Sequence, residues 1–146
     1  MTQHEIMREL AEIIEETKTG VLSTVDRDGR PHLRWMTPAV LKDRQTALFA
    51  VTCPRFSKTT HLASNPKVEW MVQSKQLNKI IHVRGIVNLL DNPFLKSEVL
   101  EELGQRLTTF WQVNCEASEF VVVETVIQEV ELYEPLKNHY EIVKFS

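Results

Sequence analysis

The chain has 146 residues and a mass of 17.0 kDa, with 42% hydrophobic residues, 25% charged residues and a net charge of −3. This composition excludes a disordered chain, and the length suits a single domain over residues 1–146. The slight negative charge and the lack of a Lys/Arg-rich block argue against nucleic-acid binding. No apolar run reaches the roughly 20 residues that cross a bilayer, and the first ten residues have no signal-peptide core. We therefore expect a cytoplasmic protein with no membrane partner.

The first third of the chain is predicted to form a helix and a β-hairpin. Residues 4–17 place isoleucine and leucine on one helical face and charged residues elsewhere. Residues 21–25 and 31–36 read as strands, and they flank the turn Asp26-Arg-Asp-Gly29. An Asp-Gly pair between such strands is a strong hairpin signal. Pro38 ends the second strand, because proline cannot donate to the hydrogen-bond ladder.

The middle of the chain predicts strand, helix and strand in turn. Residues 46–52 are short, apolar and rich in strand formers, and residues 57–64 then form a short helix. Pro66 cannot continue that helix, so the chain turns into a strand at 68–73. In residues 80–89 apolar and polar side chains alternate, which indicates a half-buried strand.

The last third predicts a helix and a long strand. Asp91-Asn-Pro93 is a helix start, and leucine or valine then recurs every four residues to position 107, with Gly104 as a possible stop. Residues 120–133 read as a long closing strand, and the pattern assigns no structure after Pro135. Six strands joined mostly by hairpins, without βαβ periodicity, predict a mainly β fold: an antiparallel barrel with flanking α-helices.

The segment between the third and fourth strands carries the most chemistry. Arg55, Ser57, Lys58 and Thr59 bring two cations and two hydroxyls to the start of the short helix. A helix N-terminus has unpaired N–H groups and a partial positive charge, so the segment is a candidate phosphate site. The alternative is a polar loop with a helix-capping serine.

Three segments, Gly20–Met36, Ser57–Val68 and Ile80–Val87, resemble in order and spacing the pyridoxamine 5'-phosphate oxidase superfamily of FMN-binding split β-barrels. They are most similar to its small general-stress-protein members. The resemblance implies a six-stranded antiparallel split β-barrel that binds FMN. It also implies a homodimer with the flavin at the interface, each site being built from both chains.

The resemblance assigns the site residues to three groups. One group lies on the phosphate side of the cofactor, a second lines the flavin ring largely through its backbone, and one aromatic residue reaches toward the partner's flavin. The residues are, in that order, Arg34, Ser57 and Lys58; Trp35, Met36, Thr37, Val51 and Thr52; and Trp111. The alternative interpretations are solvated surface cations for Arg34 and Lys58 and plain core residues for Trp35 and Met36.

Three departures from the family's oxidase limit the expected chemistry. Ser57 stands where the oxidase has an arginine, and Ile80 stands where it has a glutamine that donates to the flavin. Residues 133–146 contain no counterpart of the arginine-bearing segment that holds the substrate phosphate. We therefore do not expect oxidation of pyridoxamine 5'-phosphate.

The function that this pattern favours is an FMN-dependent oxidoreductase in which the flavin carries the electron chemistry. The alternatives are a non-catalytic flavin binder and a split-barrel binding module that has lost FMN. Haem or a deazaflavin in the same barrel is a further alternative. No HExxH motif or CxxC pair is present, so we expect no metal site. The sequence does not identify the substrate or the electron donor.

Overall fold

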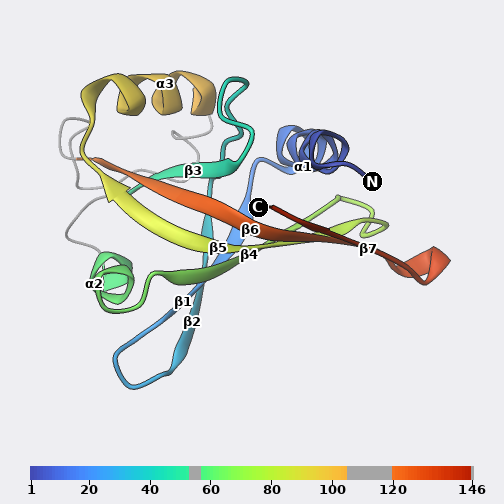
Figure 1. The fold of residues 1–146 in the computed structure, drawn as a ribbon, viewed down its shortest axis with the longest axis horizontal. Helices are drawn as coiled ribbons and strands as arrows, with labels where there is room; N and C mark the ends of the chain where they lie inside the picture. Colours follow the sequence, from blue (N-terminus) through green and yellow to red (C-terminus); the bar gives the residue numbers. More distant parts are fainter. Residues whose placement is uncertain (53–56, 105–119, 146) are drawn as a thin grey trace.

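The computed structural model describes residues 1–52, 57–104 and 120–145. The chain forms one antiparallel sheet with three α-helices around it (Figure 1). In chain order the elements are α1 (Gln3–Thr17), β1 (Gly20–Val25), β2 (Pro31–Met36), β3 (Ala47–Thr52), α2 (Ser57–Ser64), β4 (Lys67–Gln73), β5 (Ile80–Leu90), α3 (Pro93–Leu103), β6 (Val121–Glu134), the 3-10 turn η2 (Pro135–Lys137) and β7 (His139–Lys144).

The sheet has seven strands, one more than the predicted six. The strands follow the order β2-β1-β4-β5-β6-β3, and β7 pairs with β6 beside this path. The extra strand comes from the tail to which the sequence pattern assigned no structure. It forms because η2 and the left-handed Asn138 (φ 47°) reverse the chain after β6, so that Tyr140 pairs with Tyr133. This short strand mixes polar and apolar residues without a clear alternation, so the periodicity of the sequence does not reveal it.

The two edges of the main sheet path come back together at one place. Beyond the end of β2, Ala39 forms a bridge with Phe49 of β3, in which each backbone N–H donates to the other residue's carbonyl at 2.7 and 2.9 Å. Only this isolated bridge joins the two edges in the described part of the chain, so the barrel is split there. We call this place the seam: residues 36–39 of one edge and 49–52 of the other.

The interior of the barrel is apolar, with one buried polar link. Trp70 of β4 is fully buried, and its indole N–H donates to Thr125 Oγ1 of β6 at 3.0 Å. β5 lies between these strands, and its register with β6 shifts between Arg84 and Gly85. Such a bulge bends the strand and increases its twist, which helps the sheet to curl.

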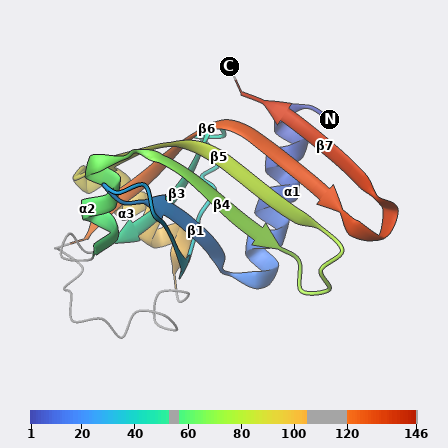
Figure 2. The ribbon, with the colours of Figure 1, turned by 90° about the horizontal axis from the view of Figure 1, so that it is seen from below.

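The helices α1 and α3 cover different parts of the sheet. α1 begins at Thr2, whose side chain accepts from the Glu5 N–H, and packs against β4 and β7 (Figures 1 and 2). α3 begins at Asn92, ends at Leu103 and packs against β3 and β6. The apolar spacing in the sequence continues to residue 107, but Gly104, the possible stop in the sequence, caps the helix at φ 50°.

β3 is buried on both faces because two clusters of apolar side chains meet on it. Leu48 and Ala50 point into the barrel interior, whereas Phe49 and Val51 point into the layer under α3. A run of six apolar or small residues therefore replaces the alternation of a half-buried strand. In the described part of the chain, no helix combines the length and apolarity needed to cross a membrane.

Candidate cofactor site

The inner face of β2 points one cation toward the barrel and α2. Across the hairpin, Leu22 pairs with Arg34 and Thr24 pairs with His32, and both β1 residues are fully buried. Directly opposed residues share a face of a sheet, so Arg34 and His32 point inward. His32 contacts His61 of α2, with ring centroids 4.4 Å apart, so Arg34 lies on the side of the strand that faces this helix.

Three buried polar atoms on or near the seam have no hydrogen-bond partner among the described residues. They are Arg34 Nη1, Thr37 Oγ1 and Thr52 Oγ1. Thr37 is 2% exposed and Thr52 is fully buried. Burial lowers the pKa of Arg34 below its usual value, because desolvation disfavours the charged guanidinium. A buried polar atom without a partner is costly in a folded protein, and the cost is larger when the atom belongs to a charged guanidinium. These atoms are therefore available to an external ligand that can hydrogen-bond with them.

The two threonines lie on the two sides of the seam. Thr37 precedes the Ala39–Phe49 bridge on one edge, and Thr52 follows it on the other. Because the two segments run antiparallel, both threonines lie on the same side of the bridge. Arg34 lies three residues before Thr37, and α2 begins at Ser57, shortly after Thr52. Two hydroxyls therefore lie on one side of the seam, with Arg34 close to one and the start of α2 close to the other along the chain.

The structure describes the candidate phosphate segment only in part. Ser57 and Lys58 open α2, as the sequence predicts, but their side chains lie outside what the structure describes. Arg55 and Trp111 also fall outside the described residues. Their assigned roles remain predictions from the resemblance.

The remaining candidates do not point into the seam with their side chains. Met36 is 2% exposed and packs in the barrel interior, and Val51 is 1% exposed and packs under α3. Only their backbone is available to line a ring, which is the role that the resemblance gave to Met36. Trp35 points to the opposite, outer face of β2 and is 72% exposed.

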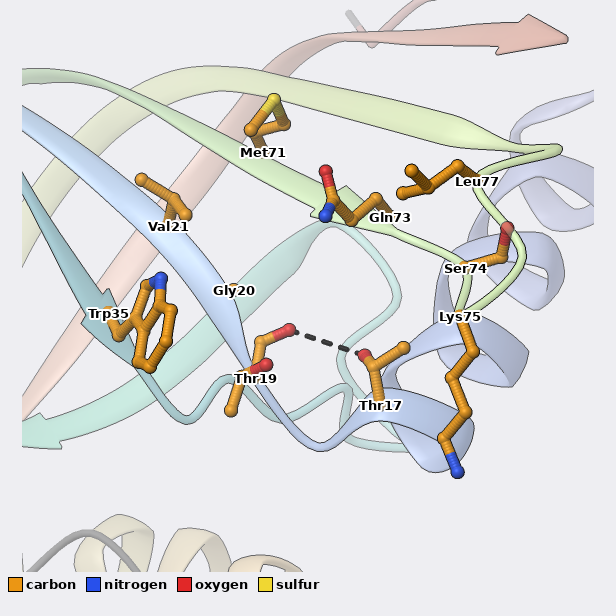
Figure 3. Close-up of a pocket in the computed structure, with 10 residues that line it drawn as sticks. All are labelled: Thr17, Thr19, Gly20, Val21, Trp35, Met71, Gln73, Ser74, Lys75 and Leu77. Atoms are coloured by element: carbon orange, nitrogen blue, oxygen red, sulfur yellow. Dashed lines mark hydrogen bonds between the residues drawn. The ribbon is translucent and has the colours of Figure 1, made fainter. Parts of the chain in front are cut away.

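On the outer face Trp35 borders an open recess of about 580 Å³ (Figure 3). Val21 and Met71 form the neighbouring apolar wall, and the amide of Gln73 lies beside them. Thr17 Oγ1 donates to the carbonyl of Thr19 at 3.3 Å at the rim. The recess and the seam lie on different faces of β2, so one small ligand does not fill both with side-chain contacts.

Sequence reasoning missed a polar cluster next to the seam. His32 Nε2 lies 2.8 Å from Asp26 Oδ2, and His61 Nδ1 lies 3.2 Å from Thr24 Oγ1. The available signal was the hairpin register, which sets His32 opposite Thr24 on the face that Arg34 shares. In the described residues, no three His, Cys, Asp or Glu side chains gather as a metal site would need.

The family model for pyridoxamine 5'-phosphate oxidase matches residues 6–134, from α1 to the end of β6. The chain belongs to the pyridoxamine 5'-phosphate oxidase family. The matched range includes the seam and every candidate site residue of the sequence analysis. No curated protein matches the sequence significantly.

Solved structures with the same fold include pyridoxamine 5'-phosphate oxidase-related proteins and proteins that carry other names. General Stress Protein 26 from Bacillus anthracis is 23% identical, with a TM-score of 0.72 over 97% of this chain and 99% of that one. A pyridoxamine 5'-phosphate oxidase-related, FMN binding protein from Nostoc punctiforme is 15% identical, with a TM-score of 0.71 over 95% and 96%. A protein named F420 reductase is 20% identical, with a TM-score of 0.65 over 82% and 93%. At these identities the likeness establishes the split-barrel fold and confirms the predicted architecture.

Proposed function

We propose that this protein binds FMN at the seam and acts as a flavin-dependent oxidoreductase. The observation that carries the proposal is the buried Nη1 of Arg34, which, like the hydroxyls of Thr37 and Thr52, has no hydrogen-bond partner among the described residues. A bound flavin supplies the electron chemistry, while the protein binds and orients it. A similar structure is named an FMN binding protein, which supports this choice of cofactor.

The chemistry of the seam suits a phosphate ester better than a neutral ligand. A guanidinium offers a planar set of donors that matches phosphate oxygens, and a helix start adds backbone N–H groups and a favourable dipole. The two buried hydroxyls suit the polar edge of a ring, because each can donate or accept. This arrangement predicts tighter binding of FMN than of riboflavin.

The decisive experiment is a visible spectrum of the purified protein with mass analysis of the released ligand. We expect FMN. The Arg34→Met variant keeps an unbranched apolar stem but removes the guanidinium and its charge, so it should bind FMN about 10- to 150-fold more weakly, the range for a charge-assisted hydrogen bond. Its riboflavin affinity should change much less. Release of a deazaflavin or haem, or a colourless protein that does not take up FMN, contradicts the assignment.

Turnover separates an oxidoreductase from a flavin binder. With FMN bound, the protein should oxidise a reduced nicotinamide or another two-electron donor in the presence of an electron acceptor. Because residues 133–146 form the end of β6, η2 and β7, with no arginine among them, pyridoxamine 5'-phosphate oxidation should be negligible. A flavin-loaded protein with no turnover on any donor favours the non-catalytic alternative.

The proposed working unit is a homodimer with flavin at the interface. The outer face of β2 supports the pairing of two chains, since Leu33 and Trp35 are both 72% exposed and border one apolar recess with Val21 and Met71. The place of the flavin at the interface rests on the resemblance. Large exposed aromatic and aliphatic side chains in one patch are typical of an interface, and two-fold pairing is the commonest assembly of soluble chains.

Leu33→Glu tests the dimer without altering a candidate site residue. A charge on this face should oppose pairing, so we expect the parent to sediment as a dimer at micromolar concentration and the variant as a 17.0 kDa monomer that has lost flavin. Phe94→Glu is the matched control, because Phe94 is 88% exposed on α3. A flavin-loaded monomeric parent contradicts the shared site.

A further inference from the structure

Two histidines join α2 to the β1–β2 hairpin next to the seam. The imidazoles of His32 and His61 lie with their centroids 4.4 Å apart and their planes tilted by 36°. His32 is bonded to Asp26 at 2.8 Å, and His61 lies 3.2 Å from the Thr24 hydroxyl. These contacts link the turn of the hairpin, both its strands and the helix in one continuous cluster.

The cluster holds two titratable rings and one carboxylate. Hydrogen bonds from His32 and from the backbone N–H groups of Arg30 and Asp28 lower the pKa of Asp26 to about 2. Asp26 is therefore an anion at neutral and mildly acidic pH. Of the two rings, Asp26 bonds only that of His32, and in the described residues no carboxylate is paired with His61.

The first proton that the cluster takes up is compatible with the observed contact. A proton on His32 is balanced by Asp26, and the resulting cation lies against the neutral, tilted ring of His61, which is a favourable arrangement. Histidine is the side-chain type that changes charge between roughly pH 5 and 8.

A second proton on the cluster is not compatible with the contact between His32 and His61. With both rings charged, the centroids of two cations lie 4.4 Å apart and the cluster holds one carboxylate, while Arg34 adds a third positive charge on the same face of β2. The Thr24 hydroxyl, which is the other group facing His61 from β1, carries no charge. Moving α2 away from the hairpin relieves this repulsion between the charged rings.

We propose that the His32–His61 pair holds α2 on the β1–β2 hairpin at neutral pH and releases it in acid. The two histidines are then positioning residues for the start of α2. Release also moves the helix away from Arg34, so anion binding at the seam weakens with it; this second consequence rests on the proposed FMN site.

Hydrogen exchange of α2 in the purified full-length protein tests the proposal directly. After correction for the intrinsic effect of pH, the protection of residues 57–64 should fall about tenfold or more between pH 7.5 and 5.5, while β5 and β6 stay protected. Unchanged protection of α2 over this range overturns the proposal, whether or not the protein binds a flavin.

Two variants identify the ring pair as the cause. His61→Asn keeps a polar group near the Thr24 hydroxyl, and His32→Gln keeps one near Asp26, but each leaves at most one charged ring. Either variant should remove the acid-induced loss of protection. His82→Gln is the matched control, since His82 bonds Glu69 at 2.8 Å on the outer face, and it should behave as the parent does. A loss of protection that persists in both folded variants overturns the proposal.

The affinity for FMN, measured over the same pH range, separates this inference from the proposed function. In one outcome α2 loosens in acid, and the FMN affinity falls with it in the parent but less in His61→Asn. Both the histidine-pair proposal and the FMN site then stand. If α2 loosens but FMN does not bind at any pH, the histidine pair stands and the cofactor assignment fails. Comparison with His61→Asn also removes the effect of the phosphate's own titration.

Discussion

Replacing Gly85 with alanine is expected to lower the midpoint of thermal unfolding by about 10 °C. A Cβ at this position would lie 2.3 Å from the Val126 carbonyl oxygen and 2.8 Å from Thr125 Cγ2. The first of these is backbone in the centre of the sheet, so it cannot move without breaking the β5–β6 ladder. Overpacking of this kind costs typically 1–3 kcal/mol, and the rigid neighbour places Gly85→Ala at about the upper limit.

Gly29→Ala separates crowding from backbone conformation in the same experiment. Gly29 has φ +83°, but nothing lies within 4 Å of a Cβ built there. Its alanine variant should lose only the roughly 1 kcal/mol that a left-handed non-glycine residue costs. If Gly85→Ala unfolds at the same temperature as Gly29→Ala, the crowding described at the bulge is wrong.

Truncating Trp70 to alanine should cost about 3–5 kcal/mol of unfolding free energy, measured by chemical denaturation. The side chain is fully buried and fills the barrel interior between β4 and β6. Removing it leaves a cavity that the curled sheet cannot collapse to fill. This loss of stability comes from the barrel interior and does not require Trp70 to contact the seam.

The hydrogen bond of Trp70 can be isolated from its packing. Thr125→Val preserves shape but leaves the indole N–H without its partner, so it should cost about 1–3 kcal/mol. In a Trp70→Phe background the same change should be nearly neutral, because no donor is left unpaired. Equal costs of Thr125→Val in the two backgrounds would show that the bond does not contribute.

Local signals were sufficient for most of the fold. The Asp26–Gly29 turn, the helical spacing of residues 4–17 and the proline at 66 each acted within a few residues, and the corresponding elements form where predicted. β7 was missed because its stability comes from pairing with β6 and not from its own pattern. The seam also depends on a contact between distant residues, Ala39 and Phe49, which no periodicity specifies.

The candidate site likewise contains some features that local sequence signals predict and others that depend on distant contacts. The strand at residues 31–36 was predicted correctly, but only the assembled barrel buries Arg34 Nη1 without a partner among the described residues. Val51 illustrates the limit, because its side chain serves the core under α3 and the resemblance alone assigned it to the site. The pairing of His32 with His61 needed the position of α2, which sequence patterns do not give.

The strand order has a consequence for how the protein acquires its site during folding. β3 and β4 are consecutive strands in the chain, yet β5 and β6 lie between them in the sheet. Among the described strands, β3 forms its ladder with β6 alone, which is made far later in the chain. Pairings between such distant segments are slow to form, because the intervening loop must be closed first. One side of the seam therefore has no fixed position until β6 is complete, and we expect the proposed cofactor site to form only as one of the last events of folding.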